Sequence, residues 1–146
     1  MTLVRDSIRI GADPQAVLAI LLDVDGYPRW QSEVDHVDVL DADDSGRPLL
    51  TKVWINALGR LGNYTVAYDY PSPAEMSYHL VEGDMMSRHD ASFRVASKDG
   101  GTELTVELDL ALKWPLPAMV VGMLARKGVG EMLTAVKGLA EAPSTH

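Results

Sequence analysis

The sequence predicts an α+β fold in which a curved antiparallel sheet of about six to seven strands wraps around one long C-terminal helix. Residues 116–140 repeat apolar side chains at helical spacing, with Val121, Ala125, Val129 and Val136 on one face. Upstream, short segments alternate apolar and polar residues and are separated by turn signals, which is typical of hairpin-linked strands with one wet face. The dry face of such a sheet needs a cover, and only this helix is long enough to provide it.

The first part of the chain predicts one strand followed by two short helices. Residues 3–11 alternate apolar and polar side chains, which indicates a strand. Asp13 and Pro14 then favour a helix start, because aspartate is a preferred N-cap and proline suits the first helical position. Apolar residues recur at helical spacing after Pro14, and this helix is expected to end before Gly26. Pro28 can begin a second short helical turn.

The middle of the chain predicts six further strands by the same criterion. They cover residues 34–41, 49–57, 61–70, 76–83, 87–97 and 102–113. The last strand has the clearest pattern, since Leu104, Val106 and Leu108 face a core while the acidic residues between them face water. Asp99-Gly100-Gly101 precedes it and is a strong hairpin signal.

Length, charge and composition limit the function. A chain of 146 residues can bury a sizeable core, and we expect one domain over residues 1–142 with a disordered tail at residues 143–146. The net charge of −8 argues against nucleic acid as a partner. The N-terminus lacks the apolar run of a signal peptide, and no apolar run is long enough to span a bilayer. A cytoplasmic location is therefore expected.

Tyrosines gather on one face of a predicted strand. Within residues 61–70, strand alternation places three tyrosines and a valine on the same side, namely Tyr64, Val66, Tyr68 and Tyr70. If that side faces inward, each hydroxyl needs a partner or water, so the enclosed space is partly polar. The alternative is a wet outer face with cross-strand aromatic pairs.

The first half of the long helix differs from an ordinary amphipathic helix. Ala118, Gly122 and Ala125 on its inner face are too small to fill the space beneath them, which predicts a cavity of about 300–1,000 Å³, the usual ligand range. Gly122, Gly128 and Gly130 each cost roughly 1 kcal/mol relative to alanine, so we expect either a close approach of another backbone or a ligand, or a kink. The other side of this half carries an apolar patch, which we expect to form the cavity mouth and to contact an apolar partner. The patch comprises Leu116, Met119, Val120, Met123 and Leu124.

The sequence indicates no metal and no cofactor. His36, His79, His89 and His146 lack the spacing of metal ligands on a helix. The acidic turn at residues 41–46 lacks the glutamate that would close a calcium loop. The absence of cysteine excludes a thiolate site and a cysteine nucleophile.

Five short strings, in order along the chain, match a known pattern. They are Asp23 to Trp30, Val81-Glu82-Gly83, Ala91 to Val95, Gly100-Gly101-Thr102 and Pro115-Leu116-Pro117. With this order of elements, the chain resembles the START-like (SRPBCC) superfamily, and more narrowly its polyketide cyclase/dehydrase and coenzyme-Q-binding branch. Ala91 and Phe93 depart from the usual Gly-Ser-Trp of that branch.

The resemblance implies the helix-grip fold, with a START-like ligand-binding domain over residues 1–142. It also implies one cavity between the sheet and the long helix, which members use for lipids, quinones, polyketides or aromatic rings. Only some members are enzymes, so the fold alone does not assign an activity.

Three hypotheses follow. The first is a carrier or binding protein for a mid-sized hydrophobic ligand such as a lipid, a quinone or a polyketide. Peripheral membrane contact, a monomer and a homodimer are all compatible with it. The predicted ligand contacts are Trp30, Val53, Ile55, Tyr64, Val66, Tyr68, Tyr78, Leu80, Phe93, Val106, Val121, Ala125 and Val129.

The second hypothesis is a cofactor-free polyketide cyclase or dehydratase, which needs hydrogen-bond donors and a base inside an apolar cavity. Its candidate catalytic residues are Tyr64, Tyr68, Tyr78, His89 and Asp90, whereas Arg94 is expected on the surface, opposite Phe93. The third hypothesis is an interaction protein that dimerises through the apolar start of the long helix. The residues leave open whether any reaction is catalysed.

Overall fold

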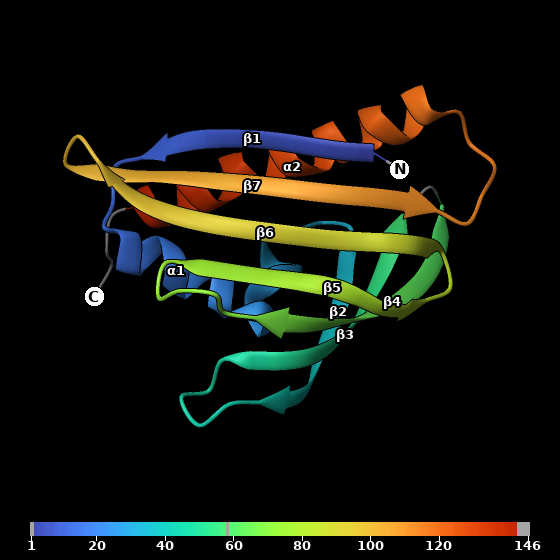
Figure 1. Ribbon diagram of the computed structural model, residues 1–146, viewed down its shortest axis with the longest axis horizontal. Helices are drawn as coiled ribbons and strands as arrows, with labels where there is room; N and C mark the ends of the chain where they lie inside the picture. Colours follow the sequence, from blue (N-terminus) through green and yellow to red (C-terminus); the bar gives the residue numbers. More distant parts are fainter. Residues whose placement is uncertain (1, 58, 143–146) are drawn as a thin grey trace.

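The computed structural model describes residues 2–57 and 59–142, so the tail expected at residues 143–146 lies outside the described residues. Figure 1 shows the arrangement of the elements. They are β1 (Thr2–Ile10), α1 (Pro14–Leu22), the 3-10 helix η1 (Val24–Arg29), β2 (Val34–Ala42), β3 (Pro48–Ala57), β4 (Arg60–Asp69), β5 (Glu75–Gly83), β6 (Met86–Lys98), β7 (Gly101–Leu112) and α2 (Ala118–Glu141). The predicted order of elements is confirmed.

All seven strands belong to one antiparallel sheet in the order β1-β7-β6-β5-β4-β3-β2. Neighbours from β2 to β7 are consecutive in sequence, as expected for hairpins. The exception is β1, which pairs with β7 so that Ile10 lies opposite Thr102. This pairing brings the first strand of the chain beside the last one. Figure 1 shows the sheet curving away from β1 and β7, with α2 running along them.

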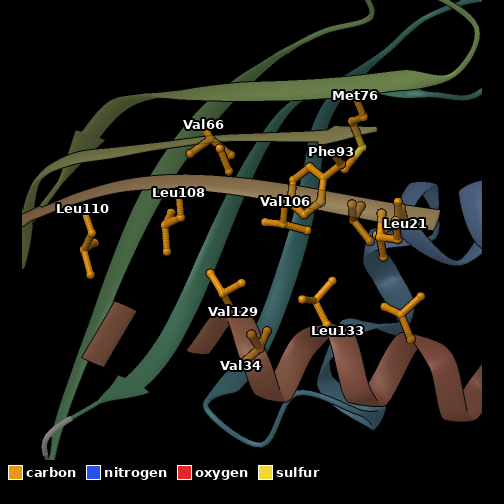
Figure 2. Close-up of a cluster of buried hydrophobic side chains, with 14 of the residues drawn as sticks. Leu21, Val34, Val66, Met76, Phe93, Val106, Leu108, Leu110, Val129 and Leu133 are labelled. Atoms are coloured by element: carbon orange, nitrogen blue, oxygen red, sulfur yellow. The ribbon is translucent and has the colours of Figure 1, made fainter. Parts of the chain in front are cut away.

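The core lies between the concave face of the sheet and α2. The side chains of Leu104, Val106 and Leu108 on β7 are all at least nine-tenths buried, as their alternation predicts. Figure 2 shows Val129 and Leu133 of α2 pointing toward this strand. Helix α2 contacts β1 and β7, and α1 packs against the same helix. The curved sheet with a long covering helix is therefore the observed architecture.

The start of α2 differs from the expectation in two places. Gly122 and Ala125 are buried as predicted, but Ala118 is exposed. The helix begins at Ala118, and its first buried residue is Val121, so the first turn extends beyond the part that packs on the sheet. Leu124 was expected on the outer side, yet it is half-buried and borders the cavity described below.

The glycines of α2 are not explained by close packing. A Cβ atom added at Gly128 or Gly130 would meet nothing within 4 Å. At Gly122 it would meet only the guanidinium of Arg126, 3.3 Å away. Of the alternatives, a close approach of another backbone does not occur at Gly128 or Gly130, and Gly128 borders the open space beneath α2.

Candidate functional site

A cavity of about 500 Å³ lies between the concave face of the sheet and the middle of α2. Its volume falls within the range that small-molecule sites usually have. The walls come from the loop before β2, the end of β3, the middle of β4 and β5, the β5–β6 connection, the inward faces of β6 and β7, and residues 124–132 of α2. A second cavity of about 60 Å³ adjoins it beneath η1 and shares Tyr64, Tyr78 and Phe93 with it.

The structure brings most of the predicted ligand contacts to these two cavities. Seven of them border the larger cavity: Ile55, Tyr64, Tyr78, Phe93, Val106, Ala125 and Val129. Val53, Val66 and Tyr68 border only the smaller one. Tyr64 and Tyr68 of β4 therefore face inward, and the alternative of a wet outer face does not apply to them. Tyr70 follows β4 and borders neither cavity.

Three predicted contacts border neither cavity. The ring of Trp30 packs edge-on against that of Tyr27, with 5.1 Å between the ring centroids. Leu80 lies on β5 opposite Val66 and packs against the core. Val121 is buried on α2, in the part of the helix that covers the sheet before the cavity begins. These three side chains fill the interior around the cavity.

Several cavity residues were not predicted. Leu108 and Leu110 of β7 border the space together with Val106, and the alternation of that strand already placed them on the same face. Met85, in the β5–β6 connection, and Met86, at the start of β6, border the cavity, and no periodic pattern in the sequence marks the direction of these side chains. Tyr27 borders the smaller cavity and belongs to the Asp23 to Trp30 string.

A buried polar pair lies on the wall of the larger cavity. The hydroxyl of Tyr78 and Nε2 of His89 are 3.0 Å apart. The pair exists because Tyr78 lies opposite Ala91 in the β5–β6 register, and His89, two residues before Ala91, points to the same face. The ring of Tyr64 meets the His89 ring edge-on, with centroids 4.8 Å apart. Three candidate catalytic residues are thus brought together.

Asp90 lies on the opposite face of the sheet. One of its carboxylate oxygens accepts a hydrogen bond from the backbone N–H of Leu80, and the other is 3.3 Å from the guanidinium of Arg88. Strand alternation separates Asp90 from His89, so this carboxylate does not reach the cavity. Arg94 is exposed on the same outer face, 4.0 Å from Glu75.

The histidine and the tyrosines of the cavity walls are uncharged at neutral pH. Burial lowers the pKa of His89 to about 4, an effect that the neighbouring charge of Asp90 partly opposes. Burial raises the pKa of Tyr68 to about 12, although the hydroxyl of Thr51, 3.2 Å away, partly opposes this. The pKa values of Tyr64 and Tyr78 are raised for the same reason, desolvation of the phenolate. The site can therefore donate and accept hydrogen bonds but supplies no charge from these residues.

Stability is expected to depend on the protonation of His89. Its pKa is about 4 in the folded protein and 6.5 without the fold, so the unfolded chain binds the proton more readily. This contribution is fully present above pH 6.5 and is lost as the pH falls toward 4, by about 3 kcal/mol in total. Urea unfolding at several pH values measures it. Between pH 4 and 6.5, the free energy of unfolding should change more steeply with pH in wild type than in His89→Gln. Parallel curves for the two proteins would contradict a lowered pKa of His89 in the fold.

Exposed apolar side chains lie on the first turns of α2 and at the start of β4. Met119 is 73% and Met123 59% exposed on the first turns of α2. Leu61, at the start of β4, is also exposed, and the guanidinium of Arg60 lies 4.9 Å from the centroid of the Trp114 ring. The expectation that this patch contacts an apolar partner stays a prediction.

The described residues hold neither a metal-ligand cluster nor a membrane-spanning helix. Residues 2–57 and 59–142 contain no group of three or more His, Asp or Glu side chains that could hold a metal ion. Within the same ranges, no helix combines the length and apolar character needed to cross a membrane.

Comparison with known proteins identifies the family. The family described as polyketide cyclase / dehydrase and lipid transport matches residues 10–137. No curated protein matches the chain. A START superfamily protein from Mycobacterium smegmatis is 25% identical, with a TM-score of 0.89 over 97% of this chain and 98% of its own.

Two further solved structures share the fold at lower identity. The Zhui aromatase/cyclase from Streptomyces sp. R1128 is 17% identical, with a TM-score of 0.82 over 95% of this chain and 93% of its own. A protein from Thermus thermophilus is 21% identical, with a TM-score of 0.75 over 95% of this chain and 94% of its own. The architecture is thus the helix-grip fold of START-like proteins. The chain belongs to the polyketide cyclase/dehydrase and lipid transport family of the START-like superfamily.

Proposed function

We propose that this protein binds a mid-sized hydrophobic ligand, such as a lipid, a quinone or a polyketide-like molecule, as a carrier or binding protein. The ligand occupies the 500 Å³ cavity between the sheet and α2. Residues 1–142 act as one ligand-binding domain in this proposal. A cytoplasmic location stays a prediction.

The observation that carries the proposal is an open cavity with a mostly apolar wall. Leu108, Leu110 and Val106 face it from β7, and Ala125 and Val129 face it from α2. A ligand that fills this volume removes its own apolar surface and that of the cavity wall from water. The free energy gained is roughly 25 cal/mol per Å² of apolar surface buried. On α2, Ala125 and Gly128 are the small lining residues, and they leave space opposite the leucines of β7.

The same volume weighs against the hypothesis of a pure interaction protein. A protein that acts only through its surface gains stability from a filled core, because each void forfeits packing contacts. An opening of about 500 Å³ costs stability unless something occupies it. The exposed Met119 and Met123 then serve ligand entry in this proposal, since flexible methionines adapt to different apolar surfaces.

Native mass spectrometry of freshly purified protein tests the proposal. We expect a mass in excess of the 15.9 kDa chain that is lost on collisional activation and on extraction with organic solvent. The extracted protein should then bind the neutral dye Nile red and increase its fluorescence. A protein without bound mass that also leaves Nile red fluorescence unchanged would contradict a ligand function for the cavity.

A second candidate function, a cofactor-free cyclase or dehydratase, is favoured by the Tyr78–His89 pair. Its groups are 3.0 Å apart and lie on the cavity wall, where a tyrosine hydroxyl can stabilise an enolate and a neutral imidazole can accept a proton. The low pKa of His89 makes it a weak base, which is why binding is the first proposal. The test is whether the protein converts a β-polyketone faster than buffer alone. If it does, and His89→Gln loses this activity, catalysis rather than binding is the function of the site.

A further inference from the structure

One polar atom of the Tyr78–His89 pair has no hydrogen-bond partner among the described residues. Nε2 of His89 shares a hydrogen bond with the Tyr78 hydroxyl, while Nδ1 is buried and has no partner among the described residues. Neutral imidazole carries a proton on only one ring nitrogen. Either Nδ1 is then a buried N–H without an acceptor, or it is a bare acceptor without a donor.

The second arrangement is less costly. Among backbone groups, unpaired buried N–H donors are rarer than under-satisfied carbonyl acceptors, and we expect the same order of cost for the imidazole nitrogens. The proton therefore belongs on Nε2, which donates to the Tyr78 oxygen. The phenolic hydrogen is then directed away from His89, and Tyr78 borders both cavities. One hydrogen-bond donor is left for a molecule inside the cavity.

The charged side chains on the cavity wall also indicate which net charge a bound molecule can carry. The cationic side chain among the lining residues is Lys127, which is largely exposed and 3.9 Å from Glu131. Two carboxylates, those of Glu33 and Glu131, border the same space. A buried carboxylate on the ligand would lose its hydration without gaining a cation, which is costly.

From this geometry we propose that the Tyr78 hydroxyl, oriented by His89, binds the carbonyl oxygen of an uncharged hydrophobic ligand and that the cavity disfavours carboxylates. This inference rests on the proposed function and specifies its ligand class as ketones or quinones rather than fatty acids. The chain N–H···O–H···O=C strengthens each of its hydrogen bonds by polarisation, because it lies in a cavity of low polarity.

Three ligands with one skeleton test the inference: ethylnaphthalene, the naphthyl methyl ketone and naphthoate, each titrated by displacement of Nile red at pH 7. Wild type should bind the ketone roughly five- to tenfold more tightly than the hydrocarbon, which is the net value of one hydrogen bond. Naphthoate should bind most weakly. Tyr78→Phe should reduce the ratio of ketone to hydrocarbon affinity to about one while leaving the hydrocarbon affinity within about twofold.

His89→Phe provides a second variant should Tyr78→Phe unfold, and it should also lower the ratio. The matched control is Tyr70→Phe, because Tyr70 donates to the carbonyl oxygen of Pro48 and borders neither cavity. It should keep the wild-type ratio.

Equal affinities for ketone and hydrocarbon in wild type would overturn the inference and leave the proposed function standing, since the hydrocarbon still binds. Naphthoate binding as tightly as the ketone would overturn the discrimination against charge. Binding of none of the three would remove the proposed function together with it.

Discussion

Replacing Leu108 with tryptophan should lower the affinity of the protein for Nile red by about tenfold or more. Leu108 is nine-tenths buried, lies near the middle of β7 and borders the larger cavity. An indole at this position projects into space that the ligand would occupy. The fold should tolerate it, because the volume beside the side chain is open and tryptophan favours strands. Fluorescence titration of Nile red measures the change.

Thr105→Trp is the matched control for this experiment. Thr105 lies on the same strand, three residues earlier, and its side chain points to the outer face opposite Ser7 and Arg94. The two variants add an aromatic ring to β7 on opposite sides of the sheet. Thr105→Trp should bind Nile red like wild type. Equal affinities for Leu108→Trp and Thr105→Trp would show that the dye binds elsewhere.

Gly101→Ala should destabilise the protein by about 3 kcal/mol. A Cβ atom added at Gly101 would lie 2.5 Å from the backbone carbonyl oxygen of Ile10, far inside van der Waals contact. Because the clash is with backbone rather than with a flexible side chain, β1 has to shift away from β7. Helix α2 also contacts β1, so the disturbance reaches the cover of the cavity. Urea unfolding followed by circular dichroism measures the loss.

Gly130→Ala is the control for the steric argument. Gly130 lies within α2, where an added Cβ would meet nothing within 4 Å. Alanine should therefore stabilise the helix, by up to about 1 kcal/mol, because it loses less backbone freedom on folding. The change from glycine to alanine should thus lower the stability at Gly101 and raise it at Gly130. A loss below about 1 kcal/mol for Gly101→Ala would mean that β1 relaxes easily.

The fold was predictable because its elements have strong local periods. Alternation on β7 placed Leu104, Val106 and Leu108 on the core face, and helical spacing placed Ala125 and Val129 on the covering face of α2. Turn signals such as Asp99-Gly100 fixed the hairpins, and the positive φ of both residues shows that this turn needs them. The secondary structure of long periodic segments can therefore be predicted from the local sequence alone.

The site was predictable only in part because it depends on which segments meet. Alternation indicated that Tyr64 and Tyr68 share a face, but the Tyr78–His89 contact requires the register between β5 and β6, which no local pattern gives. Alternation alone would have separated His89 from Asp90. Trp30 borders no cavity because it packs against Tyr27, a contact set by the turn of η1 and not by any period.

The pairing of β1 with β7 also has a consequence for the order of folding. Each hairpin from β2 to β7 joins neighbours in sequence, whereas β1 must find a strand that lies about 100 residues further along, with Thr2 opposite Leu110. Closing so long a loop costs chain entropy before any contact repays it. The hairpins therefore form first, and the ends of the chain meet late. Since α2 packs on β1 and β7 together, the nascent protein has no closed cavity until its last helix has been synthesised and the first strand has docked.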